Sequence, residues 1–314
     1  MKLSLIIPCY NEEENVQPLF EAIRGVLDGE VESYELIFIN DGSTDKTLAK
    51  LKEIANETEL PVKIINFSRN FGKEAGLYAG LKEAQGEYIS LIDADLQQNP
   101  KFVLKMVRTL EENEEYDAVA AYQEKRQESK RNIFFKNTFY KLINKISDID
   151  FVNGASDFRT FRRCVGEAIL EMPEYHRFSK GIFSWVGFNT YYMPYDADAR
   201  LTGNSKWSFW KLFKYAIEGI VAFTTLPLRI SSFVGSLSSV ASIIYLIVVI
   251  IQKLAFGIAI PGYATIVVLI LLLGGLQLAA LGIIGEYLAR TYVQTKHRPI
   301  YVAREVISNH SPNS

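Results

Sequence analysis

The stretch Tyr88-Ile89-Ser90-Leu91-Ile92-Asp93-Ala94-Asp95-Leu96-Gln97 decides the fold. Its apolar first half has the length of a buried strand, and it ends in two carboxylates one residue apart. Open α/β sheets bind ligands at the carboxyl ends of their strands. Carboxylate oxygens at such an edge suit a hard divalent cation, which completes its shell with substrate phosphates. The alternative is an acidic turn without a metal, because a D-x-D motif alone is weakly specific.

The same pattern of a strand followed by a polar turn recurs on both sides of this stretch. Strands are predicted at 3–7, 34–39, 62–67, 88–92 and 118–121, and helices at about 16–26, 44–55, 74–84, 101–114 and 162–172. Ser43 or Thr44 is expected to cap the second helix, and residues 153–159 to form a compact polar turn. Strands that alternate with helices imply right-handed crossovers and a mostly parallel sheet. The predicted fold class is therefore α/β and Rossmann-like.

The polar turns that follow parallel strands share one edge of the sheet. This edge is expected to gather Asp41, Asp93 and Asp95 near Tyr10 and Glu12. A carboxylate after the second strand can accept a hydrogen bond from a uracil N–H or a ribose hydroxyl. The alternative for Asp41 is that its Asn-Asp-Gly-Ser sequence simply makes a tight turn.

Charge is distributed unevenly along the 314 residues. Residues 1–226 contain 28 Lys and Arg against 34 Asp and Glu, whereas residues 227–314 contain six against two. An acidic N-terminal part argues against a nucleic-acid-binding protein. Two cysteines are too few for a disulfide framework and favour a reducing compartment. The apolar start before Pro8 is too short for a signal peptide, so the N-terminal part is expected to stay in the cytosol.

Two long apolar segments lie near the C-terminus, at about 230–251 and 263–288. Each is long enough to span a bilayer of roughly 30 Å. Because a short link joins them, they are predicted to form a transmembrane hairpin, in which Gly274, Gly275 and Gly282 would allow close packing. Basic residues before the first span and after the second place both ends in the cytoplasm. The alternative is a pair of core helices in a soluble protein.

Two further segments are predicted to lie at the membrane surface. Residues 130–146 form a basic amphipathic helix, for which a core-facing helix with solvated lysines is the alternative. Residues 207–226 begin with aromatic side chains interleaved with lysines, as in an interfacial belt. Between them, Arg200 and Lys206 flank a Gly-Asn-Ser loop that can cradle phosphate oxygens.

Together these motifs resemble the family-2, GT-A-fold polyisoprenyl-phosphate glycosyltransferases. The motifs are Pro8-x-Tyr10-Asn11-Glu12, Asn40 to Asp45, Asp93 to Gln97, Ser156 to Arg159, Ser205 to Ser208, and Gly285 to Leu288 with Arg298-Pro299. The chain is similar to dolichol-phosphate mannose synthases and, in its architecture, to bacterial undecaprenyl-phosphate glucosyl- and N-acetylglucosaminyltransferases with a C-terminal hairpin. The resemblance implies a GT-A catalytic domain over 1–226, a hairpin over 227–290 and a cytosolic tail over 291–314.

The resemblance also implies roles for individual residues. The donor would be bound by Pro8, Tyr10, Glu12, Ile39, Asp41, Asp93 and Ala94. The metal, Mg²⁺ or Mn²⁺, would be bound by Asp95, Asp93 and Gln97. Catalysis would involve Asp157, Lys206 and Arg200, and the acceptor phosphate would contact Arg126, Arg200, Ser205 and Lys206. Many relatives carry Arg where this chain has Gln123, so Lys125 or Arg126 is expected to take over.

The activity implied is inverting transfer of glucose or N-acetylglucosamine from a UDP-sugar to a polyprenyl phosphate at the plasma membrane. Asp157 is expected to orient the acceptor or the sugar rather than to remove a proton, because a phosphate monoester is already largely ionised at neutral pH. A separate flippase and a downstream glycosyltransferase would handle the product, and a homo-oligomer is compatible with the pattern. Two alternatives are a processive polysaccharide synthase, whose Gln-x-x-Arg-Trp motif this sequence lacks, and a non-catalytic membrane-anchored scaffold.

Overall fold

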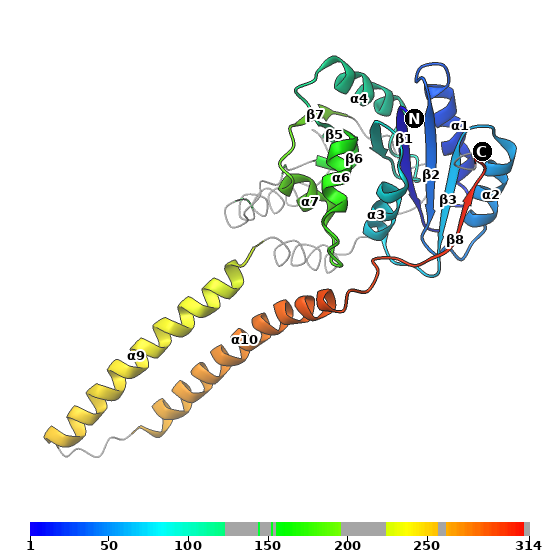
Figure 1. Cartoon of the computed structure of the whole chain (residues 1–314). Helices are drawn as coiled ribbons and strands as arrows, with labels where there is room; N and C mark the ends of the chain where they lie inside the picture. Colours follow the sequence, from blue (N-terminus) through cyan, green and yellow to red (C-terminus); the bar gives the residue numbers. More distant parts are fainter. Residues whose placement is uncertain (123–143, 145–151, 153–154, 196–223, 257–261, 311–314) are drawn as a thin grey trace. The chain divides into compact units, whose positions relative to one another are not determined.

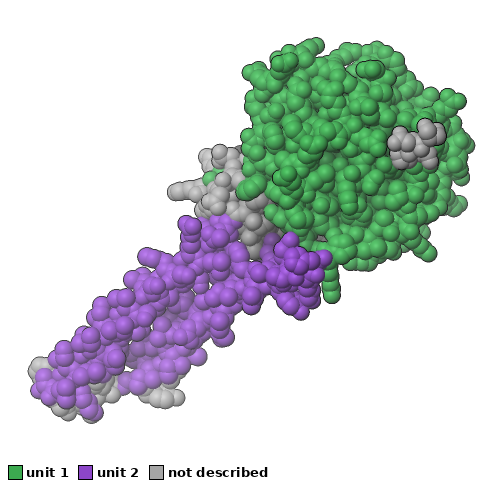
Figure 2. All heavy atoms as spheres, in the orientation of Figure 1, with its two compact units in different colours: residues 1–145, 149–212, 298–314 green, residues 146–148, 213–297 purple. Residues whose placement is uncertain are grey.

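The computed structural model describes residues 1–122, 144, 152, 155–195, 224–256 and 262–310 (Figure 1). The chain divides into two compact units, which Figure 2 distinguishes by colour. The first unit contains residues 1–145, 149–212 and 298–314, and the second contains 146–148 and 213–297. The C-terminal residues therefore belong to the first unit, although they follow the second along the chain.

A parallel four-stranded core organises the first unit. β1 (Leu3–Cys9) pairs with β2 (Tyr34–Asn40) and β4 (Tyr88–Leu91), and β2 pairs with β3 (Val62–Phe67). The full order among the described strands is β7-β5-β6-β4-β1-β2-β3-β8. Near-continuous burial of β1 and β2 shows that both faces of the sheet are covered, as expected for parallel strands. The predicted α/β fold with a mostly parallel sheet is confirmed.

Helices connect and cover these strands. They are α1 (Val16–Leu27), α2 (Thr47–Glu57), α3 (Lys73–Glu83), α4 (Lys101–Glu112), α6 (Arg163–Leu170) and α7 (Ser179–Trp185). α1 buries one apolar stripe at helical spacing, including Leu19 and Ile23. α3 approaches the sheet so closely that a Cβ on Gly80 would lie 2.3 Å from Cγ2 of Ile6. A small residue is therefore required where α3 crosses β1.

The start of α2 differs from the prediction. Neither Ser43 nor Thr44 caps it, because the hydroxyl of Ser43 accepts a hydrogen bond from the backbone N–H of Asn11. The start of α2 is held by Asp45 instead. Oδ1 of Asp45 accepts a hydrogen bond from the backbone amide of Thr47 at 3.0 Å and another from the Thr47 hydroxyl at 2.6 Å. Its Oδ2 accepts from the amide of Glu13 at 3.2 Å. One carboxylate thus joins the helix start to the loop after β1.

Residues 155–162 form a strand, so the predicted turn over 153–159 is wrong for the described part of that segment. β6 (Ala155–Arg162) runs antiparallel between β4 and β5 (Ala118–Tyr122). Phe158 and Thr160 are fully buried, and Arg159 is also buried, with its guanidinium 4.0 Å from the centre of the Phe183 ring. Because this segment contains charged and hydroxyl side chains, its sequence does not indicate a strand that is covered on both faces.

Two strands lie at the edges of the sheet. β7 (Thr190–Pro194) pairs in parallel with β5, and β8 (Ala303–Ser308) pairs antiparallel with β3. Asn309 secures the end of β8: its amide group donates to the carbonyls of Ala55, Thr58 and Leu60, and its Oδ1 accepts from the amide of Val62. The tail predicted over 291–314 therefore contains the last strand of the sheet.

The second unit contains two long helices, α9 (Leu226–Phe256) and α10 (Tyr263–Thr295). Both are apolar over spans of 30 and 28 residues, yet no residue in the most apolar window of either span is buried by protein. Phe233 and Leu254, for example, are 69% and 82% exposed. Helices that are apolar all round belong either in a core or in a bilayer, and among the described residues no protein core covers these two. Length, composition and exposure all fit membrane spans.

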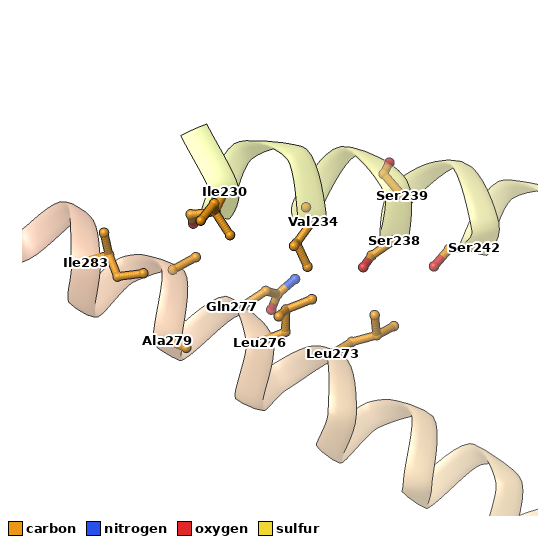
Figure 3. A pocket seen from close by; sticks show the side chains of 13 residues that line it. Ile230, Val234, Ser238, Ser239, Ser242, Leu273, Leu276, Gln277, Ala279 and Ile283 are labelled. Carbon is orange, nitrogen blue, oxygen red and sulfur yellow. The ribbon is translucent and has the colours of Figure 1, made fainter. Parts of the chain in front are cut away.

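α9 and α10 contact each other along a face rich in small and hydroxyl residues. Between them lies a cavity of about 470 Å³ lined by serines of α9, such as Ser238 and Ser242, and by Leu273 and Gln277 of α10 (Figure 3). The prediction that Gly274, Gly275 and Gly282 allow close packing is wrong within this chain. A Cβ at any of the three would meet nothing within 4 Å.

Candidate active site

The carboxyl edge of the parallel strands brings the predicted acidic residues together. Asp93 follows β4, and β6 pairs with β4 in an antiparallel register that sets Leu91 opposite Arg159. Continuing that register by two residues places Asp93 opposite Asp157. Because β6 is antiparallel, its starting end lies at the same edge as the end of β4. This topology explains how two residues far apart in sequence share one site.

A lysine that the sequence analysis did not single out joins these two carboxylates. The Nζ of Lys73, at the start of α3, lies 2.6 Å from Oδ1 of Asp93 and 3.5 Å from Oδ2 of Asp157. The side chains are 40%, 33% and 28% exposed, respectively, so the cluster remains open to solvent. One ammonium group therefore bridges the end of β4 and the start of β6.

Mutual attraction stabilises the charged forms in this cluster. Burial lowers the pKa of Lys73, but the carboxylates of Asp93 and Asp157 outweigh it and leave the pKa above its ordinary value. Burial likewise raises the pKa of Asp157, and the positive charges of Lys73, Lys180 and Arg159 outweigh it, so the pKa falls below its ordinary value. Asp157 is thus ionised at neutral pH and is a weak base.

Asp93 is also fixed from its other side by Gln98, a second residue that the sequence analysis missed. The side-chain carbonyl of Gln98 accepts from the amide of Asp93 at 2.8 Å, and its amide group donates to Oδ2 of Asp93 at 3.0 Å. Gln98 is 6% exposed. Its reciprocal pair of hydrogen bonds sets the orientation of the Asp93 carboxylate.

The turn that holds Asp95 is conformationally strained. Leu96 has φ of 61°, a value that bulky L-residues rarely adopt and that costs of order 1 kcal/mol or more. Oδ1 of Asp95 accepts from the amide of Gln97 at 3.2 Å, across the strained residue.

Burial raises the pKa of Glu12 despite its hydrogen bond from Asn15, and the carboxylates of Asp95, Asp45 and Asp93 raise it further. Negative charge is therefore concentrated here.

The residues present fit a cation that is shared with a ligand rather than one enclosed by protein. Within the described residues, no group of three or more His, Cys, Asp or Glu side chains is placed to hold a metal ion. Asp95 and Asp93 supply carboxylates at a negatively charged edge, which suits Mg²⁺ or Mn²⁺ when diphosphate oxygens complete the shell. The backbone of Gln97 is placed by Asp95, and its role as a ligand stays a prediction.

Asp41 holds two loops together. Its carboxylate accepts from the amides of Phe71 at 2.6 Å and Gly72 at 2.9 Å, in the loop before α3. Gly72 has φ of 95°, and Gly42 lies so close to Arg69 that a Cβ would be 2.4 Å from its backbone carbon. Asp41 is 4% exposed. Asp41 therefore has a role in the turn. Its carboxylate has further lone pairs with which to accept a hydrogen bond from a nucleobase, and this contact stays a prediction.

The other residues expected to contact the donor differ in their exposure to solvent. Tyr10 is 48% exposed at the end of β1, and Pro8 lies just before it on β1. Ile39 is fully buried, and its Cδ1 packs where α3 crosses the sheet at Gly80. Its side chain is therefore occupied by core packing, and its assignment as a donor-binding residue stays a prediction. Ala94 is also buried, at 2% exposure, between the two aspartates.

Some predicted residues lie outside the part of the chain that the structure describes. These are Arg126, Arg200, Ser205 and Lys206, the helix over 130–146, and residues 207–223 of the segment 207–226. Their assignments stay predictions.

The mostly parallel α/β sheet, with an Asp-x-Asp turn after β4, agrees with the GT-A fold that the sequence resemblance implies. Residues 4–169 match the model of glycosyl transferase family 2, to which the chain belongs. It is therefore a glycosyltransferase.

Similar proteins extend this match along almost the whole chain. The putative glycosyltransferase CsbB of Bacillus subtilis is 43% identical over 96% of this chain and 91% of that protein. The uncharacterized glycosyltransferase sll0501 of Synechocystis sp. is 41% identical over 98% and 96%. The bactoprenol glucosyl transferase of Shigella phage SfV is 37% identical over 97% and 98%. The similarity thus includes α9 and α10 as well as the catalytic unit.

Proposed function

We propose that this protein transfers glucose or N-acetylglucosamine from a UDP-sugar to a polyprenyl phosphate, with inversion at the anomeric carbon. The observation that supports it best is the end-to-end similarity to a bactoprenol glucosyl transferase. A polyprenyl acceptor stays in the bilayer, and this chain carries two apolar helices next to a GT-A unit. The GT-A fold is suited to bind the nucleotide-sugar donor, and the two apolar helices are suited to hold the protein at the membrane that contains the acceptor.

In the proposed reaction, a phosphate oxygen of the acceptor forms a bond to the anomeric carbon of the sugar. The bond from that carbon to the diphosphate oxygen breaks, and its electron pair leaves with UDP. A phosphate monoester has its second pKa near 6, so the acceptor is largely a dianion at neutral pH and has no proton to lose. The lowered pKa of Asp157 agrees with this, because a weak base is suited to orient the acceptor or the sugar.

The difficult step is the departure of UDP, which concentrates negative charge at the diphosphate. A divalent cation on Asp95 and Asp93 would stabilise that charge when bound. Arg200 and Lys206 are proposed to grip the donor and acceptor phosphates, with Ser205 and Arg126 on the acceptor side. Pro8, Tyr10, Glu12 and Asp41 are proposed to hold the nucleoside.

The proposal extends to membrane topology. α10 ends at Thr295, and β8 begins at Ala303 in the same sheet as β1 to β4. The chain therefore leaves the catalytic unit, crosses two apolar helices and returns to it, so both ends of the hairpin belong on one side of the membrane. Basic residues near these ends, including Arg229 and Arg298, favour the cytoplasm. We propose a multi-pass plasma-membrane protein with a cytoplasmic catalytic unit.

Two spans offer no obvious path for the sugar, so a separate flippase is expected to move the product across the membrane. A downstream glycosyltransferase would then use the lipid-linked sugar for the cell envelope.

Membranes containing the protein test this function directly. They would be incubated with polyprenyl phosphate and either radiolabelled UDP-glucose or radiolabelled UDP-N-acetylglucosamine. We expect a chloroform-soluble, acid-labile product from one donor, which also identifies the sugar. The Asp95→Asn variant should form none, since an amide cannot supply the charge that holds the cation against the diphosphate. A labelled polymer would instead indicate a processive synthase, and no labelled product from any UDP-sugar would indicate a scaffold.

A further inference from the structure

Lys73 occupies a position with an unusual consequence for metal binding. Its ammonium is 2.6 Å from Oδ1 of Asp93, one of the two aspartates of the Asp-x-Asp turn. The other carboxylate oxygen of Asp93 is engaged by Gln98. Both oxygens of Asp93 thus have partners within the protein, and one partner carries a full positive charge. The ammonium of Lys73 therefore repels a divalent cation at Asp93.

The position of Lys73 is set by the backbone before it. Asp41 accepts hydrogen bonds from the amides of Phe71 and Gly72, and Gly72 adopts φ of 95°, which favours glycine. Lys73 begins α3 directly after this fixed turn. This turn therefore places the backbone of Lys73 beside the two carboxylates.

A purely stabilising role explains this bridge poorly. All three charged side chains are partly exposed, by more than a quarter, and solvent screening limits what such ion pairs contribute to folding. Two carboxylates at a ligand edge would, without a counter-charge, attract a divalent cation from solution. The ammonium offsets that attraction until a ligand with its own negative charge arrives.

We propose that Lys73 is a built-in counter-ion that prevents the Asp93–Asp95 turn from holding a divalent cation until the diphosphate of the donor is present. The diphosphate then offsets the positive charge of Lys73 and supplies the remaining oxygen ligands, so metal and nucleotide bind together. This inference rests on the proposed function, because it requires a nucleoside-diphosphate donor at this edge.

Manganese binding to the purified full chain tests the inference without any turnover. Free Mn²⁺ would be followed by electron paramagnetic resonance, with and without UDP. In the wild-type protein, UDP should tighten Mn²⁺ binding strongly. In Lys73→Met, Mn²⁺ affinity without UDP should rise at least tenfold, so that the effect of UDP shrinks. Lys73→Arg, which keeps the charge, should behave like the wild type.

Lys82→Met is the matched control, because Lys82 is an exposed lysine on the same helix. Circular dichroism would verify folding, and Lys73→Gln provides the same comparison if the methionine variant fails to fold. An unchanged or weaker Mn²⁺ affinity in a folded Lys73→Met protein without UDP would overturn the counter-ion role while leaving the proposed function intact. If UDP fails to tighten Mn²⁺ binding in the wild type, the proposed donor site is wrong and the counter-ion role falls with it.

Discussion

The orientation of the Asp93 carboxylate is set by Gln98, a residue that is not part of an acidic motif. Gln98 both accepts from the amide of Asp93 and donates to its carboxylate, and it is almost fully buried. Hydrogen bonds to charged groups contribute about 1.5–3 kcal/mol each. The geometry of the carboxylate therefore depends on a neutral side chain five positions away.

We expect Gln98→Leu to lower kcat/KM by about 10- to 100-fold, because the leucine leaves Asp93 free to rotate away from the metal and Lys73. Steady-state transfer assays on the purified protein measure this. Gln17→Leu, at a partly exposed glutamine of α1 that donates to Glu21, serves as the control and should retain activity. Normal kinetics in Gln98→Leu would show that Asp93 needs no orientation from this side.

Residue patterns alone located the acidic members of the site but not their partners. Asp93, Asp95 and Asp157 belong to motifs that can be recognised within a few residues. Lys73 and Gln98 are ordinary in sequence, and their partners become apparent only when loops from three strands meet at one edge. The Gly72-Lys73 pair after a strand was the one local signal for the lysine, since a glycine there indicates a special turn.

At the scale of single elements, the start of α2 depends on Asp45. Burial would raise the pKa of Asp45, but hydrogen bonds from Thr47 and Glu13 outweigh it and lower the pKa below 3.8. A carboxyl group whose pKa falls on folding stabilises the protein above its unfolded pKa, and this contribution is lost as the pH falls through the folded pKa. The helix start is therefore sensitive to acid.

We expect Asp45→Ala to destabilise the first unit by about 1 kcal/mol at pH 7, as typical for loss of a helix cap. The difference from the wild type should shrink as the pH falls through the lowered folded pKa of Asp45, because the carboxylate of the folded wild type is then protonated as well. Thermal unfolding in detergent at several pH values measures both effects. Glu53→Ala, on the exposed side of α2, should leave stability unchanged. A difference that grows toward acid pH would contradict this assignment.

Strands with local apolar patterns were predicted well, and strands defined by distant partners were not. β2 to β4 match their predicted ranges within one residue at each end, and β1 extends two residues beyond its predicted end. β6 was mistaken for a turn because Arg159 is buried against Phe183, a contact that sequence alone does not reveal. β8 was not predicted at all, because its short alternating sequence forms a strand only against β3, more than 230 residues earlier.

Asn309 should be needed to keep β8 in place. Asn309→Ala removes donors to three carbonyls and the acceptor for Val62, so we expect a loss of about 1–3 kcal/mol in the free energy of unfolding. Differential scanning calorimetry of the detergent-solubilised chain measures it. His310→Ala, at the exposed neighbouring position, is the control. Equal melting temperatures for the wild type and Asn309→Ala would show that β8 is held without this side chain.

At the scale of the whole molecule, the route of the chain makes a prediction about topology. A reporter active only in the cytoplasm should work when fused at residue 314 and fail when inserted at 257–261, between the two spans. A reporter active only outside the cytoplasm should give the opposite result. Activity of one reporter at both positions would overturn the hairpin.

The pairing of β8 with β3 also sets an order of events during synthesis. Both apolar helices are translated before β8, so the sheet cannot be completed while they emerge from the ribosome. Domains begin to fold as they are made, so β1 to β4 can assemble early with the outer edge of β3 still unpaired. An unpaired strand edge is a template for association with other chains. Under the proposed topology, the hairpin is therefore inserted before the sheet closes, and we expect the unpaired edge of β3 to need protection during that interval.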